Sequence, residues 1–151
     1  MNFPLPEPMR LALAEARAAA QAGEVPVGAV VTRDGAVLGI GRNRMRADQD
    51  PTAHAEVVAM RAAAQALGDW RLDGCDLWVT LEPCAMCAGA VALARVSRLY
   101  FGAPDPKGGA VLHGPRLFGQ PTCHHAPEVY PGIGEGEAGE MLRDFFRERR
   151  T

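Results

Sequence analysis

The residues best suited to chemistry in this chain are His54, Glu56, Cys84 and Cys87. An imidazole and two thiolates are ligands that Zn²⁺ prefers, and the spacing of the two cysteines places both sulfur atoms on one face of a helix. Three protein ligands leave one tetrahedral position open, which separates a catalytic zinc site from a closed structural one. We therefore expect His54, Cys84 and Cys87 to hold one catalytic zinc ion per subunit.

Glu56 follows His54 closely and is not needed as a metal ligand. A zinc ion lowers the pKa of a bound water from about 15.7 to about 7, which makes hydroxide available at neutral pH. A carboxylate beside that water can move protons between it and the reacting molecule. Side chains two residues apart point away from each other in mid-helix, so both reach one water only near a helix start. We predict Glu56 as the catalytic proton shuttle.

Two other interpretations of the cysteine pair stay open. A Cys-x-x-Cys segment is commonly a redox pair or one half of a structural zinc site. A redox pair leaves His54 and Glu56 unexplained. A structural site needs a fourth ligand, for which the chain offers Cys75, His113, Cys123, His124 and His125. The three-ligand spacing favours the catalytic zinc over both alternatives.

Length and composition fit one globular domain. The chain has 151 residues, of which 48% are hydrophobic and 23% charged, and this is enough for a sizeable core. We expect residues 1–151 to form a single domain. The sequence holds no apolar run of about 18 residues that indicates a membrane span, and residues 1–6 lack the regions of a signal peptide. Two of the four cysteines serve as predicted ligands, so we expect no disulfide framework and a cytoplasmic location.

The charge balance argues against a strongly basic nucleic-acid-binding protein. The formal net charge is −2 and the isoelectric point is near 6.1,. A local basic patch is still compatible with phosphate contacts. The end of the chain offers such a patch, which is equally compatible with a solvated helix face: Arg143, Arg147, Arg149 and Arg150.

Apolar periodicity and end signals predict four helices. Three of them are expected at residues 8–22, 52–67 and 84–94,. Asp50 or Thr52 is expected to cap the second, and Pro83 suits the start of the third. The last helix follows from an apolar stripe in which at least one phenylalanine belongs to the core: Ala138, Met141, Leu142, Phe145 and Phe146,.

Five strands are expected between these helices, at residues 27–31, 37–40, 77–81, 99–102 and 128–131,. Asp34-Gly35 predicts a hairpin turn between the first two. Residues 103–127 show no clear periodicity, which is typical of a functional loop.

This order of elements predicts a layered α/β domain with helices on both faces of a sheet. The third and fourth strands are joined through a helix and should be parallel. Cys84 then lies at the carboxyl end of a strand, where ligands of open α/β sheets bind. We expect the two helix starts that carry His54 and Cys84 to face each other across the metal.

The motifs themselves resemble those of one known family. The runs 25–31, 41–43, 50–56 and 79–90 are similar to those of the bacterial tRNA-specific adenosine deaminases, which are zinc-dependent nucleobase deaminases,. Further similarity lies in residues 101–107 and 144–147. The resemblance implies the three-layer α/β/α cytidine-deaminase-like fold, with a mixed sheet of about five strands. It also implies a homodimer that hydrolyses adenosine to inosine at the wobble position of a tRNA anticodon.

The resemblance also assigns roles by position. His54, Cys84 and Cys87 match the zinc ligands, Glu56 matches the proton shuttle, and Asn43 matches an asparagine that hydrogen-bonds the target base. An amide suits that task because it carries both donors and acceptors for a purine edge. Asn43 is also compatible with a turn residue that caps the end of a strand.

The chain departs from the family pattern between residues 105 and 135, where it has Lys107-Gly108-Gly109-Ala110 and lacks one basic residue that the family pattern has at a place where substrate contacts could lie. This departure and the acidic isoelectric point favour one alternative, a zinc-dependent deaminase of a free base or nucleoside such as guanine, adenine or cytosine. A second alternative is a non-catalytic partner subunit with a structural zinc. Glu56 argues against it, because such a subunit needs no proton shuttle.

Overall fold

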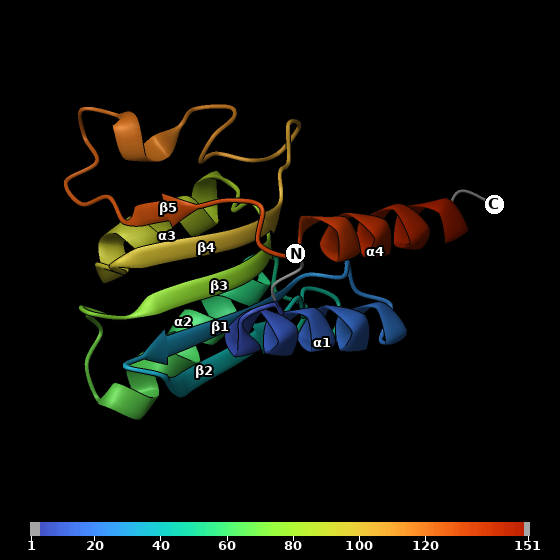
Figure 1. Cartoon of the computed structure of the whole chain (residues 1–151), viewed down its shortest axis with the longest axis horizontal. Coiled ribbons are helices and arrows are strands. Elements are labelled where there is room, and N and C mark those ends of the chain that lie inside the picture. The colour runs from blue at the N-terminus through green and yellow to red at the C-terminus, as the bar shows by residue number, and fades with distance from the viewer. Residues whose placement is uncertain (1–3, 150–151) are drawn as a thin grey trace.

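A mixed sheet of five strands forms the centre of the molecule, as the computed structural model shows for residues 4–149 (Figure 1). The strand order is β2-β1-β3-β4-β5. The strands are β1 (Gly28–Arg33), β2 (Ala36–Arg42), β3 (Asp76–Leu81), β4 (Arg98–Ala103) and β5 (Glu128–Tyr130). β1 runs antiparallel to β2 and β3, whereas β3, β4 and β5 are parallel. The predicted mixed sheet is confirmed, including the parallel pairing of the third and fourth strands.

The β1–β2 hairpin has the predicted turn. Asp34 and Gly35 both have positive φ angles, 50° and 82°. Two central residues with positive φ fit a turn whose twist matches that of the flanking strands. Because β1 is antiparallel to both β2 and β3, these two strands run in the same direction. The carboxyl end of β2, which Asn43 follows, therefore lies on the same side of the sheet as the carboxyl end of β3.

Four helices cover the two faces of the sheet, α1 (Glu7–Gln21) and α4 (Glu135–Glu148) on one and α2 (Ala55–Leu67) and α3 (Ala85–Ala94) on the other (Figure 1). Because successive side chains of a strand point to opposite faces, each strand contributes to two cores. Val30 and Trp78 pack with α1 and α4, while Val31 and Val79 pack with α2 and α3. The three-layer α/β/α fold is thereby confirmed.

Both helices of the predicted metal site begin later than the sequence indicates. α2 begins at Ala55, not at residue 52, and its N-cap residue is His54 itself. Asp50 does not cap the helix, because its carboxylate accepts hydrogen bonds from the backbone and hydroxyl of Thr52. α3 begins at Ala85 after an N-cap at Cys84. Pro83 therefore lies two residues before the first helical residue instead of at the helix start, and two of the three predicted ligands, His54 and Cys84, occupy the caps.

The C-terminal part of the chain follows the remaining predictions. The irregular segment after β4 contains one short 3₁₀ turn, η1 (Leu117–Gly119). In α4, Phe145 is buried and Phe146 is 46% exposed, so one of the two phenylalanines belongs to the core. Within residues 4–149, no helix is long and apolar enough to cross a bilayer. Arg150 lies outside the described residues.

Candidate metal centre

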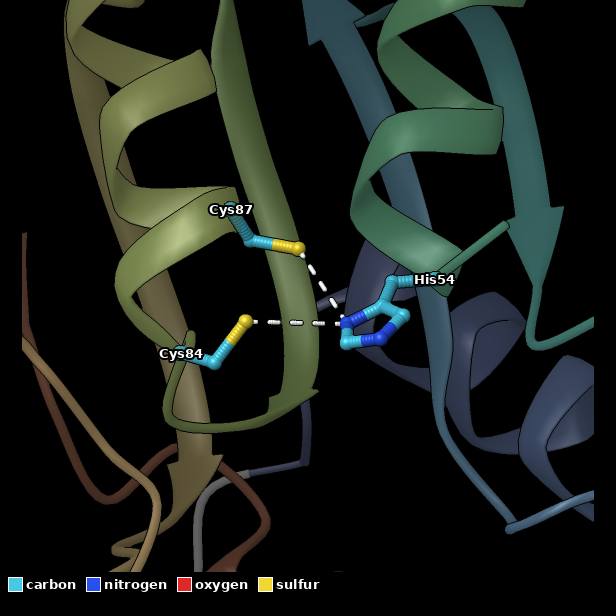
Figure 2. Close-up of side chains that lie close together, drawn as sticks. All are labelled: His54, Cys84 and Cys87. Carbon is cyan, nitrogen blue, oxygen red and sulfur yellow. Dashed lines mark hydrogen bonds between the residues drawn. The ribbon is translucent and has the colours of Figure 1, made fainter. Parts of the chain in front are cut away.

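The three predicted ligands lie together at the facing ends of α2 and α3 (Figure 2). His54 Nδ1 is 3.6 Å from Cys84 Sγ and 3.5 Å from Cys87 Sγ. All three ligand atoms lie within 4.8 Å of one another. Zinc–nitrogen distances of about 2.0 Å and zinc–sulfur distances of about 2.3 Å separate two tetrahedral ligands by about 3.6 Å. The two nitrogen–sulfur distances therefore fit a zinc ion held by these residues.

Local structure explains how this cluster forms. His54 and Cys84 are N-cap residues with extended backbones, and Cys87 lies in the first turn of α3. Unpaired amides and the positive end of the helix dipole gather at both helix starts. This environment stabilises thiolate and carboxylate groups, so two helix starts pointing at one place form a suitable cradle for anionic ligands.

The thiols of Cys84 and Cys87 differ in acidity. Hydrogen bonds with Cys87 and then with His54 lower the pKa of the Cys84 thiol to about 3. The hydrogen bond with Cys84, together with burial, raises the pKa of the Cys87 thiol. The hydrogen bond with Cys84 also raises the pKa of His54. Cys84 is thus the more acidic of the two thiols, and binding of a metal releases the protons that the ligands hold.

Glu56 occupies the second position of α2 and is only 4% exposed. Burial raises the pKa of its carboxyl group to about 7. A carboxyl group that titrates near neutral pH suits both the acceptance and the delivery of a proton. The shuttle role stays a prediction, and the position beside the ligands supports it.

A cavity of about 200 Å³ opens onto this cluster, and His54, Glu56 and Cys84 form part of its lining. Drug-sized ligands occupy sites of about 300–1,000 Å³, so this cavity suits a ligand of the size of one base. The remaining wall is mixed, with apolar side chains and a few polar groups: Val25, Val27, Asn43, Met45, Leu81, Glu82, Asp105 and Gly108.

Asn43 lines the same cavity and is held firmly. Its side-chain Nδ2 donates a hydrogen bond to the Val25 carbonyl at 3.1 Å. Its Oδ1 accepts the Ala55 amide, the first of α2, at 2.8 Å. An asparagine amide offers two N–H donors and two lone pairs, so one donor and one acceptor stay available. The structure shows a bracing role for Asn43 that the sequence did not indicate, and the base contact stays a prediction.

None of the other His and Cys residues joins the cluster among residues 4–149, where the three ligands form the only compact metal-binding group. His113 Nδ1 is 2.7 Å from Glu82, and His125 Nε2 is 2.6 Å from the Val96 carbonyl. The Cys123 thiol donates to the His125 carbonyl. The structure gives no support to a structural site with a fourth ligand from these side chains.

Glu82 is the feature of this site that the sequence analysis missed. Its side chain is fully buried, and its carboxylate accepts hydrogen bonds from backbone amides instead of facing solvent. Burial raises its pKa, but hydrogen bonds from the Asp105 backbone, from His113 and from the Leu112 and Val111 backbones outweigh that effect and lower it overall. No motif predicted these contacts, since their donors come from the irregular segment after β4.

Comparison with known proteins gives a consistent family assignment. Residues 6–150 match the model of the MafB19-like deaminase family. A tRNA-specific adenosine deaminase from Agrobacterium fabrum is 59% identical over 142 residues, which cover 94% of this chain and 93% of that protein.

Two solved structures extend the comparison. A structure from a study of A-to-I editing by tRNA:A34 deaminases at the wobble position of transfer RNA is 58% identical, with a TM-score of 0.88 over 89% of this chain and 98% of the other. A guanine deaminase from Bacillus subtilis is 30% identical, with a TM-score of 0.65 over 100% of this chain and 96% of the other.

Proposed function

This chain belongs to the tRNA-specific adenosine deaminases within the MafB19-like deaminase family, and on that premise we propose that it hydrolyses adenosine to inosine at the wobble position of tRNA. One observation carries the proposal. Two thiols and an imidazole, spaced for a zinc ion with an open position, adjoin a buried carboxyl group in a cavity of base size.

In this proposal His54, Cys84 and Cys87 hold the zinc, and the remaining residues bind the base and move protons. The zinc supplies a Lewis acid that makes water nucleophilic at neutral pH. Glu56 accepts a proton from the attacking water and delivers it to N1 of the adenine ring. The Glu56 carboxylate then takes the proton of the new hydroxyl group at C6 and passes it to the amino group, so that the C–N bond breaks, ammonia leaves and C6 becomes the carbonyl of inosine. Asn43 orients the base with the donor and acceptor that its bracing contacts leave available.

An RNA substrate is also compatible with the surface of α4, although the chain carries a net charge of −2. Arg143 and Arg147 line a hollow there beside the exposed ring of Phe146. Guanidinium groups beside aromatic rings suit contacts with phosphates and unstacked bases of single-stranded RNA loops.

A homodimer is the second part of the proposal. Apolar side chains stand exposed along α3 and after α2, with Leu93 72%, Trp70 65% and Met86 38% exposed. Hollows of about 460 and 310 Å³ adjoin this face, and Leu93 lines both. Large apolar patches on a protein surface mark interaction sites. A second copy covering the α2–α3 face also gives a broader surface for a tRNA stem-loop, and such an enzyme would act in the cytoplasm with its substrate.

A deaminase of a free base is the competing function, favoured by the 30% identity to a guanine deaminase. The test is incubation of the zinc-loaded protein with bulk tRNA, followed by sequencing for A-to-G changes at the wobble position. We expect those changes with the wild-type protein and none with Glu56→Ala. A KM for RNA that rises steeply with salt concentration supports phosphate contacts. Ammonia release from guanine, adenine or cytosine, without editing of tRNA, would favour the competing function.

A further inference from the structure

The Glu82 carboxylate receives five hydrogen bonds from one segment of the chain. Its Oε2 accepts the successive amides of Val111, Leu112 and His113 at 3.1, 2.9 and 3.2 Å. Its Oε1 accepts the Asp105 amide at 2.9 Å and lies 2.7 Å from His113 Nδ1. The side chain is 0% exposed. A buried carboxylate is costly unless hydrogen bonds satisfy it, so this segment is arranged around the charge.

Glycine allows the segment to close around the carboxylate. A Cβ atom at Gly109 would lie 2.5 Å from the Glu82 carboxyl carbon and 2.6 Å from the Asp105 carbonyl. Real Cβ atoms do not approach other atoms that closely, so any larger residue at position 109 pushes the segment away. Gly109 therefore packs directly against the buried carboxylate of Glu82, where no larger residue fits.

The same segment forms one wall of the base-sized cavity. Asp105 and Gly108 line that cavity together with Glu56 and Cys84. A second contact joins the segment to the residue before Cys84, because the Ala110 amide donates a hydrogen bond to the Pro83 carbonyl at 2.9 Å. Glu82 thus lies between the end of β3 and Cys84, and its hydrogen bonds connect this wall to the strand that leads into the predicted ligand Cys84.

We infer that Glu82 is a positioning residue that holds the wall formed by residues 105–113 at the distance required for the substrate base. The inference rests on the proposed deaminase function. Although Glu82 belongs to the cavity lining, its carboxylate is 0% exposed and engaged by five donors, so we assign it no contact with the base or the reacting atoms. Loss of the carboxylate therefore weakens substrate binding more than it slows the chemical step.

The variant Glu82→Gln tests this, because an amide has nearly the same shape but turns an NH₂ group toward backbone donors. We expect it to raise the KM for an anticodon stem-loop RNA about tenfold while kcat falls about twofold or less. Zinc content should equal that of the wild type. Hydrogen exchange should accelerate at the amides of residues 105 and 111–113 and stay unchanged in α1 and α4.

Two further variants secure the interpretation. Gly109→Ala keeps every charge but forces the wall off the carboxylate, and it should reproduce the rise in KM even where Glu82→Gln does not fold. Asp76→Asn removes a carboxylate at the opposite end of the same strand, where Asp76 lies near Arg98. This matched control should leave KM unchanged.

The outcomes separate the inference from the proposed function. A wild-type protein that makes no inosine would contradict the proposed function. An active wild type whose Glu82→Gln and Gly109→Ala variants keep the normal KM would overturn the positioning role. Loss of zinc from Glu82→Gln would overturn it as well, because the residue would then act on the metal ligands instead of the wall.

Discussion

Glu56 separates a catalytic from a structural interpretation of the metal centre at the level of single residues. Removing its carboxylate, as in Glu56→Gln, keeps the shape of the side chain and the three metal ligands. We expect zinc to remain bound and turnover to fall about 100- to 10,000-fold, the usual contribution of a general acid–base group. Zinc analysis and single-turnover deamination of an RNA stem-loop check this. Near-normal turnover would contradict the shuttle role.

Removal of the metal is the complementary test of the same cluster. A chelator should abolish deamination, and readdition of zinc should restore it, because the core among the strands, α2 and α3 is independent of the ion. Unfolding should also become easier, since a ligand at a hundred times its Kd stabilises the folded state by about 2.7 kcal/mol. Activity that survives complete loss of zinc would contradict the metal assignment.

The sequence was sufficient to predict that His54, Cys84 and Cys87 lie together, because their types and spacing are chemically restrictive. His54, Cys84 and Cys87 lie within 4.8 Å of one another, as the predicted zinc site requires. The role of Glu82 was not predictable, since four of its five partners are backbone amides from the segment after β4, and backbone donors leave no trace in residue types. The bracing contacts of Asn43 escaped for the same reason.

At the level of elements, two glycines of β2 set how closely α2 approaches the sheet. A Cβ atom at Gly41 would overlap the Ala55 carbonyl and lie 2.6 Å from the Ala59 amide. A Cβ atom at Gly39 would overlap α2 one turn further along and lie 2.7 Å from the Ala63 amide. The first position adjoins the turn that carries Glu56, whereas the second does not.

This difference gives a matched pair of variants. Gly41→Ala and Gly39→Ala should each destabilise the fold by about 1–3 kcal/mol, the usual cost of overpacking. Only Gly41→Ala should also lower the deamination rate about 100-fold, because it displaces the catalytic turn. Denaturant unfolding and kcat/KM measure the two effects. An equal loss of activity in both variants would show that the loss follows stability alone.

The helices and strands were largely predictable from the sequence, whereas the residues at which α2 and α3 begin were not. Short apolar runs indicated all five strands, and the parallel pairing of β3 with β4 followed from the intervening helix. The starts of α2 and α3 were placed too early because cap preferences favour Asp50, Thr52 and Pro83. His54 and Cys84 occupy the caps instead, with extended backbones and no capping hydrogen bond from their side chains.

For the whole molecule, the proposed homodimer rests on the exposed apolar α2–α3 face. Leu93 is 72% exposed at its centre, so Leu93→Asp should weaken a dimer by about 2 kcal/mol or more, as loss of a hot spot does,. Val37→Asp is the control, since Val37 is 44% exposed on β2. Analytical ultracentrifugation measures both. A monomeric wild type, or a Leu93→Asp variant that dimerises normally, would contradict the proposed interface.

The most direct test of the central claim follows the oxygen atom. An anticodon stem-loop RNA with adenosine at the wobble position is incubated with the zinc-loaded protein in water enriched in heavy oxygen. We predict that inosine forms only at that position, that each inosine carries one heavy oxygen, and that ammonia appears in equal amount. Unaltered adenosine in the RNA, or inosine without heavy oxygen, would contradict hydrolytic deamination of tRNA by this chain.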